Sequence, residues 1–359
     1  MITKKTFIIA EAGVNHNGSM DIARSLIDAA VAAKADAVKF QSFVATSIVT
    51  ASAQKADYQI VQTGGQESQL EMLQHLELSH TQQRELFEYC NSCGIAFLST
   101  PFDTESLRFL VDSIGLSIIK IGSGELTNAP FLLEVARCAK QVILSTGMST
   151  IAEVQSALGV IAFGMTNDQT SNPSLTACEK ALASDAGREV IRQRVTLLHC
   201  TTDYPTSPTD INLKAMLTLR EKFGCQVGLS DHSVGTHISV GAVAMGATVI
   251  EKHLTTSRNL IGPDHKASLE PEEFKTLVAN IRDIEVAFGS AEKNPTANEM
   301  KNQQVARRSI VASKPIKLGE TFTTENIVVK RPGTGQSPFK YWDLLGTKST
   351  RDIAENEMI

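Results

Sequence analysis

The sequence has no excess of basic residues and no long apolar run. Its 359 residues include 34 Lys and Arg against 39 Asp and Glu, which leaves a formal net charge of −5. Such a chain lacks the positive surface that binding to nucleic acid or to an anionic membrane requires. No apolar run approaches the roughly 20 residues of a membrane helix. These absences argue against nucleic acid and membranes as partners.

Cysteine is scarce as well. Of the six cysteines, Cys90 and Cys93 alone form a Cys-x-x-Cys pair. Because no second pair completes a zinc site, we interpret them as structural residues, and the scatter of the others implies no disulfide framework. The first residues turn polar at Glu11, before the apolar core of a signal peptide could form. We therefore expect a cytoplasmic protein.

The sequence does contain a regular alternation of short apolar runs and amphipathic stretches. The runs, rich in β-branched residues, are 7–10, 37–40, 95–98, 118–121, 142–144, 195–198, 227–229 and 248–250. Eight strands, each followed by a helix, indicate an α/β protein with a closed (β/α)₈ TIM barrel. A Rossmann sheet is disfavoured, because Thr127 stands where the third glycine after Gly122 and Gly124 belongs.

The composition changes after Phe288, which predicts a domain boundary. We expect a barrel over 1–288, a polar linker over 289–305 and a small β-rich domain over 306–359. Two further stretches inside the barrel, 41–77 and 164–192, are long enough to be lids or variable surface, and the role of 164–192 stays open.

Each predicted strand is followed by chargeable or hydroxylated residues. In a TIM barrel the carboxyl ends of the strands meet at one face, where active sites lie. The candidate residues at these ends are Glu11, Lys39, Gln41, Thr100, Lys120, Ser123, Glu125, Ser145, Tyr204, Ser230, His232 and His253. A purely structural barrel would not need this pattern, so we predict an enzyme.

Lys39 and Lys120 lie in or at the end of apolar strands. A buried ammonium group needs a partner, which is either a carboxylate such as Glu11 or Glu125 or an anionic ligand. The nearby hydroxyl groups and glycines favour a phosphate or carboxylate ligand. We therefore predict an anion site on one side of the barrel mouth.

His232 and His253 end neighbouring strands and could share one divalent cation with open positions for substrate and water. Two protein ligands suggest an exchangeable Mn²⁺ or Mg²⁺ ion. Glu11 and Glu125 could handle protons, without a firm division between them. Asp264 could hold a sugar hydroxyl.

With these residues identified, the sequence resembles the sialic acid synthase (NeuB-like) family, and more closely its N-acetylneuraminate and legionaminate branch. The motifs that carry the resemblance are IIAEAGVNHNG, AVKFQ, FLSTPFD, IKIGSGE, LSTGM, LSDHS and EKH, in the family's order. Farther on, RRSIVASKPIKLGE and VVKRPGTGQSP resemble the C-terminal SAF domain of that family, which is related to type III antifreeze protein.

The resemblance implies a phosphoenolpyruvate-dependent transferase that forms a C–C bond with an N-acyl mannosamine-type sugar and releases phosphate by C–O cleavage. The implied phosphoenolpyruvate-binding residues are Lys39, Thr100, Lys120, Ser123, Ser145 and Ser230. The implied catalytic residues are Glu11, Glu125 and Lys39, the sugar-binding residues Gln41, Tyr204, Asp264 and Arg331, and the metal ligands His232 and His253. Arg331 would come from the SAF domain of a partner subunit, which implies a domain-swapped homodimer.

The exact activity has one favoured interpretation and several alternatives. Within the family we expect N-acetylneuraminate synthase acting on N-acetylmannosamine, and the alternative is a legionaminate or pseudaminate synthase acting on a diacetamido-trideoxyhexose. A metal-dependent barrel hydrolase would explain the histidines but not Lys39 and Lys120. A non-enzymatic interpretation would make the C-terminal domain an ice- or carbohydrate-binding module.

Overall fold

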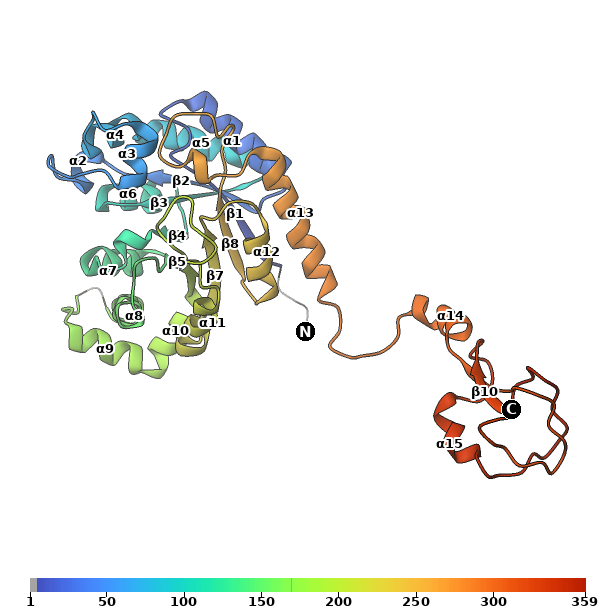
Figure 1. The fold of residues 1–359 in the computed structure, drawn as a ribbon. Coiled ribbons are helices and arrows are strands. Elements are labelled where there is room, and N and C mark those ends of the chain that lie inside the picture. Colours follow the sequence, from blue (N-terminus) through green and yellow to red (C-terminus); the bar gives the residue numbers. More distant parts are fainter. Residues whose placement is uncertain (1–4, 169) are drawn as a thin grey trace. The chain divides into compact units, whose positions relative to one another are not determined.

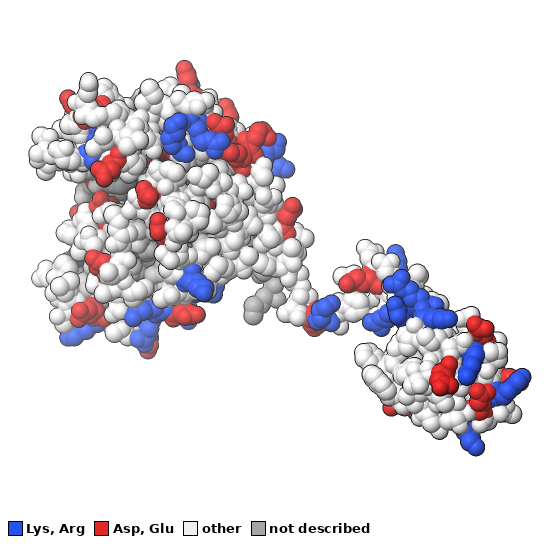
Figure 2. Space-filling view, viewed as in Figure 1, with Lys and Arg blue, Asp and Glu red and all other residues white. Residues whose placement is uncertain are grey.

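The computed structural model describes residues 5–168 and 170–359. The chain divides into two compact units, Met1–Phe288 and Gly289–Ile359 (Figure 1). Within the described ranges, no helix is both long and apolar enough to cross a membrane. On the face drawn in Figure 2, acidic and basic side chains are interspersed over the first unit, as the small net charge leads one to expect.

The first unit is built on an eight-stranded sheet in the order β3-β2-β1-β8-β7-β6-β5-β4. Its strands are β1 (Phe7–Gly13), β2 (Ala37–Ser42), β3 (Ala96–Pro101), β4 (Ile118–Ile121), β5 (Gln141–Ser145), β6 (Val195–His199), β7 (Gln226–Asp231) and β8 (Val249–His253). The paired strands are parallel. The two ends of the order, β3 and β4, contact each other and complete the ring. The predicted (β/α)₈ barrel is therefore confirmed.

Helices follow the strands and cover the outside of the barrel (Figure 1). They are α1 (Met20–Ala32), α5 (His80–Cys93), α6 (Thr104–Arg108), α7 (Ala129–Cys138), α8 (Ile151–Thr166), α11 (Lys214–Phe223), α12 (His237–Ala244) and α13 (Pro271–Ala287). Local sequence sets several of their ends. Thr150 and Glu153 form a capping box that starts α8, and Gly94 ends α5 in the left-handed conformation with a φ of 73°.

Both long stretches that the sequence left unassigned contain helices. The first holds α2 (Ala45–Ile48), α3 (Asp57–Thr63) and α4 (Gln69–Leu76). The second holds α9 (Leu175–Ala183) and α10 (Asp185–Arg194), and α9 packs on α8. A Cβ on Gly159 of α8 would lie 3.2 Å from the carbonyl oxygen of Cys178, so glycine permits this close packing.

The interior of the barrel carries a separate apolar layer, which we call the plug. The plug consists of Ile9, Ala37, Leu98, Ile143, Leu198 and Val249, with Phe7 and Ile118 packed against it. A Cβ on Gly228 would lie 2.2 Å from the carbonyl oxygen of Val249, so the inside of the barrel is tightly filled at this level. A larger apolar core separates the strands from the surrounding helices.

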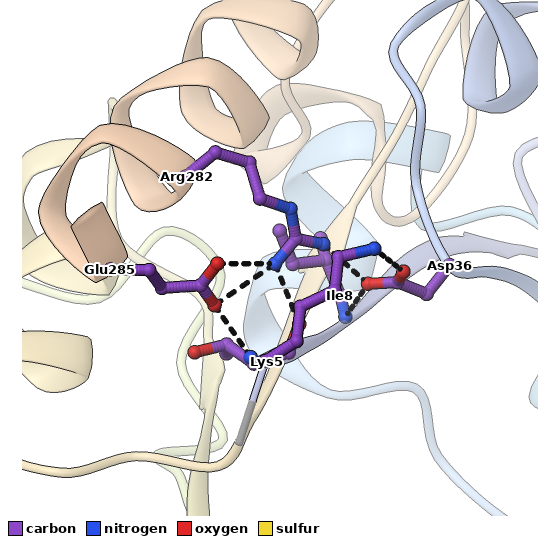
Figure 3. A network of polar contacts seen from close by, with 6 residues as sticks. Lys5, Ile8, Asp36, Arg282 and Glu285 are labelled. Atoms are coloured by element: carbon purple, nitrogen blue, oxygen red, sulfur yellow. Dashed lines mark hydrogen bonds and ion pairs between the residues drawn. The ribbon is translucent and has the colours of Figure 1, made fainter. Parts of the chain in front are cut away.

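At the amino ends of β1 and β2, a network of ion pairs holds α13 against the barrel (Figure 3). Arg282 lies 2.6 Å from Asp36 and 3.0 Å from Glu285. Asp36 also pairs with Lys5 at 2.6 Å and accepts a hydrogen bond from the backbone N–H of Ile8. We call Lys5, Asp36, Arg282 and Glu285 the amino-end cluster.

The second unit has its own small core. It contains α14 (Ala297–Ala306), the antiparallel strands β9 (Ser309–Ala312) and β10 (Ile327–Lys330), and α15 (Tyr341–Leu344). Its core residues are Ile310, Ala312, Ile316, Phe322, Ile327 and Ile353. The segment 289–305 that we expected to be a linker thus contains most of a helix. A capping box of Thr296 and Glu299 starts that helix, and none of its residues is buried.

Candidate active site

A cavity of about 400 Å³ lies at the carboxyl ends of the strands. This size is within the range of small-molecule sites. The predicted site residues that line it are Glu11, Lys39, Gln41, Thr100, Lys120, Ser123, Ser145, Tyr204, Ser230, His232, His253 and Asp264. The structure therefore brings together residues that are up to 253 positions apart in the numbering of the chain.

The period of a β-strand explains why these side chains face the cavity. Successive side chains of a strand point to opposite faces, so a residue two positions beyond an inward residue also points inward. Two positions after the plug residues come Glu11, Lys39, Thr100, Ser145, Cys200 and Glu251, and Lys120 follows Ile118 in the same way. A polar layer thus lies directly on the apolar plug.

Lys39 and Lys120 share this layer with two carboxylates. The ammonium group of Lys39 lies 2.6 Å from Glu11, 2.9 Å from the hydroxyl of Thr100 and 3.6 Å from Glu251. Lys120 lies 3.3 Å from Glu251. The four charged side chains, which we call the floor cluster, are at most 5% exposed. Their positions place the charges at the bottom of the cavity.

Burial and mutual attraction shift the pKa values of the floor cluster. Burial raises the pKa of Glu11 to about 7, although Lys39 opposes the shift. Burial also acts to raise the pKa of Glu251, but Lys120 and Lys39 outweigh it and lower that pKa to about 2. Burial lowers the pKa of Lys120, and the charge of Glu251 opposes that shift. When both lysines are charged and Glu251 is ionised, the cluster carries a net positive charge below pH 7, where Glu11 is protonated. It can therefore bind an anion.

Glu251 was missed as a site residue by the sequence analysis. It lies on β8 two residues before His253, so it shares the inward face of that strand. This spacing could have identified it. Glu125, by contrast, lies in a 3-10 turn after β4 and accepts a hydrogen bond from the side chain of Asn128 at 2.7 Å. It does not line the cavity, so the carboxylate partner of Lys120 is Glu251 and not Glu125.

His232 and His253 lie side by side at the same mouth, with ring centroids 5.5 Å apart. Burial lowers the pKa of His232 to about 4 and that of His253 well below its usual value, so both rings are neutral. His232 donates a hydrogen bond from Nδ1 to the carbonyl oxygen of Thr201 at 2.6 Å. In a neutral ring this leaves the lone pair on Nε2.

These two rings fit a divalent cation. The buried Nδ1 of His253 has no hydrogen-bond partner among the residues that the structure describes. Across residues 5–168 and 170–359, no group of three or more His, Cys, Asp or Glu is placed to hold a metal ion. A cation held here would therefore need oxygen ligands from substrate or water, as expected for an exchangeable Mn²⁺ or Mg²⁺ ion.

An ion pair behind the histidines fixes the strands that carry them. Lys252 lies 3.0 Å from Asp231, and both side chains are at most 1% exposed. Asp231 also accepts hydrogen bonds from the hydroxyls of Ser233 and Ser239 at 2.6 Å. Asp231 directly precedes His232, and Lys252 directly precedes His253. The ion pair therefore helps to hold the two rings in place.

A row of aromatic rings leads from His232 to the first insertion. Tyr204 lies 4.2 Å from His232 and 5.1 Å from Tyr58 of α3, measured between ring centroids. Asp264, which lines the same cavity, has its pKa raised to about 6 by burial. The hydroxyl, amide and carboxyl groups of Tyr204, Gln41 and Asp264 can form hydrogen bonds with a polyhydroxylated ligand.

Arg331 belongs to the second unit and follows β10. Its Nε donates a hydrogen bond to the carbonyl oxygen of Ala306 at 3.0 Å, and the residue is exposed. Its role in the site stays a prediction.

Comparison with known proteins gives consistent matches along the chain. Residues 26–293 match the NeuB family, and residues 307–359 match the SAF domain. An N,N'-diacetyllegionaminic acid synthase of Campylobacter jejuni is 47% identical over 99% of both chains. A protein of the same name from Legionella pneumophila is 41% identical over 97% of this chain and 91% of that one.

A solved structure is similar as well. The crystal structure of an N-acetylneuraminic acid synthetase from Leptospira borgpetersenii in complex with citrate is 32% identical. It has a TM-score of 0.63 and covers 83% of this chain and 90% of that one.

Proposed function

The chain belongs to the NeuB family and ends in a SAF domain, and from this premise we propose that it synthesises a legionaminic acid-type sugar. It is a transferase-type enzyme, as the sequence predicted. The proposed substrates are phosphoenolpyruvate and a 2,4-diacetamido-2,4,6-trideoxyhexose. The relatives at 47% and 41% identity carry the name of diacetyllegionaminic acid synthase, which supports this acceptor. Our expectation of N-acetylneuraminate as the product has less support, because a relative named for that acid is only 32% identical.

The observation that carries the proposal is the juxtaposition of the floor cluster with His232 and His253 in one cavity. Phosphoenolpyruvate carries both a carboxylate and a phosphate, and the charges of Lys39 and Lys120 suit such a donor. The hydroxyls of Thr100, Ser145 and Ser230 would add hydrogen bonds to the phosphate or carboxylate oxygens. Ser123 also lines the cavity and would have the same role, and its hydroxyl accepts a hydrogen bond from the N–H of Gly147 at 3.0 Å.

The acceptor reacts as an open-chain aldehyde. His232 and His253 would hold a Mn²⁺ or Mg²⁺ ion, which when bound supplies Lewis-acid polarisation of the aldehyde oxygen. Tyr204, Gln41 and Asp264 orient the hydroxyl and amide groups of the sugar next to the donor. This arrangement would hold the two reacting carbons next to each other in one cavity.

The bond changes balance for one water molecule consumed. C3 of phosphoenolpyruvate forms a bond to the aldehyde carbon as the C=O π bond opens, and the aldehyde oxygen takes up a proton to become a hydroxyl group. Water adds at C2, and the C–O bond to phosphate breaks, so that C2 becomes a ketone and phosphate leaves. Glu11, with a pKa of about 7, can accept a proton from the attacking water or return one to the leaving oxygen. Glu125 lies outside the cavity lining, so we assign this role to Glu11.

The proposal extends to assembly and location. The family resemblance supports a domain-swapped homodimer in which Arg331 of one subunit reaches the site of the other, and a cytoplasmic enzyme.

The activity is tested by incubating the protein with phosphoenolpyruvate, Mn²⁺ and each acceptor in turn while released phosphate is measured. We expect the diacetamido-trideoxymannose to be turned over faster than N-acetylmannosamine or an altrose-type sugar. EDTA should stop the reaction, and excess Mn²⁺ should restore it. No phosphate release with any of these acceptors would refute the proposal.

The shared site is tested by combining two inactive chains. His253→Ala removes a metal ligand, and Arg331→Ala removes the residue that the SAF domain would supply. Co-expression should restore part of the activity, because one mixed site then combines an intact barrel with an intact arginine. Lys348→Ala, elsewhere in the second unit, serves as the control and should be fully active alone. Failure of the mixture to recover activity would contradict the exchange of domains.

A further inference from the structure

The cavity lining contains two unlike groups of side chains. Opposite in character to the floor cluster is a group of apolar side chains that line the same cavity. They are Val14, Met72, Leu73, Leu76 and Phe102, which we call the apolar wall. All five belong to one hydrophobic cluster that also contains Phe43 and Ala45. The wall is therefore the cavity-facing side of a packed core and not a set of isolated residues.

Helix α4 supplies most of the wall. Met72, Leu73 and Leu76 are spaced at one, three and four positions, which places them along one side of the helix. A capping box of Ser68 and Glu71 starts α4. At its other end, a Cβ on Gly18 would lie 2.6 Å from the carbonyl oxygen of His75. The helix is thus held tightly against the loop that follows β1.

The connection before α4 is also fixed. Lys55 is buried, and its ammonium group lies 2.9 Å from the hydroxyl of Thr63 and 3.0 Å from Glu67. Lys55 also donates a hydrogen bond to the carbonyl oxygen of Gly64. These contacts tie α3 to the segment that enters α4, so the wall has a defined position in the folded chain.

In the proposed function, the polar side chains of the lining serve the charged and polar groups of the two substrates. The floor cluster binds the charged donor, and the two histidines face the aldehyde of the acceptor. Tyr204, Gln41 and Asp264 serve hydroxyl and amide groups. The side chains of the wall have no donor and no acceptor apart from the weakly accepting sulfur of Met72. A hydroxyl placed against them would lose its hydrogen bonds to water without replacement, whereas a methyl group would gain from burial.

We propose that the apolar wall binds the deoxygenated C6 end of the acceptor and selects a 6-deoxy sugar over its 6-hydroxy counterpart. This inference rests on the proposed function and adds to it the residues that determine acceptor choice. The aldehyde carbon must lie at the histidines to react, which leaves C6, at the opposite end of the chain of carbons, free to contact another part of the lining.

The test uses two acceptors that differ only at C6, namely 2,4-diacetamido-2,4,6-trideoxymannose and 2,4-diacetamido-2,4-dideoxymannose. We expect the unmodified enzyme to prefer the 6-deoxy sugar by at least about tenfold in kcat/KM, the scale of discrimination of one small apolar group. Leu73→Gln, at a half-buried wall position, should reduce the preference to less than about threefold. The loss should appear mainly as a higher KM for the 6-deoxy sugar.

Leu70→Gln is the matched control. Leu70 lies on the same helix and packs on the same cluster, is also half-buried, and does not line the cavity. It should keep the full preference. Leu73→Ala, which shortens the side chain without adding polarity, should give an intermediate preference and provides a second measurement if the glutamine variant does not fold.

The outcomes separate this inference from the function on which it rests. Turnover of both sugars at equal kcat/KM by the unmodified enzyme overturns the role of the wall and leaves the synthase activity intact. An unchanged preference in both Leu73 variants overturns it as well. If neither sugar releases phosphate, the proposed function and the inference fall together.

Discussion

Two clusters of charge occupy opposite ends of the same strands. The amino-end cluster joins Lys5, Asp36, Arg282 and Glu285 where β1 and β2 begin, as Figure 3 shows. The floor cluster joins Glu11, Lys39, Lys120 and Glu251 where β1, β2, β4 and β8 end. Each combines two carboxylates with two cationic side chains, so composition alone does not distinguish them.

Their surroundings do distinguish them. In the amino-end cluster the carboxylates also accept backbone hydrogen bonds, and Lys5 is 61% exposed. The floor cluster is buried, has a raised pKa at Glu11 and a lowered one at Glu251, and faces a cavity. Buried charged groups with strongly shifted pKa values in a cavity are typical of a functional site. Carboxylates whose hydrogen bonds and ion pairs are all made within the protein, near its surface, are typical of a structural one.

The largest effect that separates the clusters is expected from Lys120→Met. Removing this charge takes away electrostatic stabilisation of the donor, so kcat/KM should fall by about 10²- to 10³-fold. The free energy of unfolding should fall by less than the roughly 3 to 5 kcal/mol that breaking a lone buried pair costs, because Glu251 keeps Lys39 as a partner at 3.6 Å. Steady-state phosphate release and thermal unfolding measure the two quantities. A variant that loses stability but keeps its activity would contradict the assignment of the floor cluster.

Arg282→Met should show the opposite pattern. The guanidinium pairs with Asp36 and Glu285 and donates a hydrogen bond to the carbonyl oxygen of Thr6. Its loss should lower the free energy of unfolding by about 2 kcal/mol, the usual value for hydrogen bonds to charged groups. The kcat/KM of the folded enzyme should stay the same. Urea unfolding together with the phosphate assay tests both statements. A drop in kcat/KM would contradict a purely structural role of the amino-end cluster.

Glu11 makes the floor cluster sensitive to pH. Its pKa of about 7 is raised by burial, so the carboxyl group is neutral below pH 7 and negative above it. The cluster then loses its net positive charge as the pH rises, and phosphoenolpyruvate should bind several-fold more weakly at pH 8 than at pH 6. Equilibrium binding measured by calorimetry tests this. Glu11→Gln should flatten the dependence, and an equally steep curve in that variant would disprove the role of Glu11.

The smallest effect is expected from Lys5→Ala. Its ion pair with Asp36 is 2.6 Å long, but the lysine side chain is 61% exposed. Exposed pairs of this kind contribute about 0.5 kcal/mol or less. The free energy of unfolding should therefore change by about that amount, and the change should shrink in high salt. If Lys5→Ala lowered the free energy of unfolding as much as Arg282→Met, the exposure of Lys5 would not explain a smaller contribution to stability.

The positions of Lys39, Lys120, His232 and His253 could be predicted from the sequence. Parallel strands of a barrel carry their last inward residues to one mouth, so a polar residue at the end of an apolar run is enough to locate it. Glu125 could not be placed in this way, because the chain turns after β4 and takes that side chain out of the cavity. Local periodicity says nothing about such a turn.

The first insertion was harder to predict because α2, α3 and α4 are short and their apolar residues do not form a long periodic pattern. The Ser68 and Glu71 capping box is a local signal for the start of α4. The apolar wall, however, depends on Val14 and Phe102 meeting α4 in space. Such contacts are non-local, so the wall could not be predicted from the sequence.

The plug beneath the floor cluster has a kinetic consequence. Ile143 and Val249 of the plug also line a smaller cavity at the amino end, and that cavity shares no lining residue with the one above. Reactants therefore enter and leave through the same mouth. The compound that occupies the deeper position must arrive first, and the one nearer the mouth then blocks its escape. For the proposed reaction, this geometry predicts an ordered mechanism in which the phosphate-bearing reactant binds first and the sugar second.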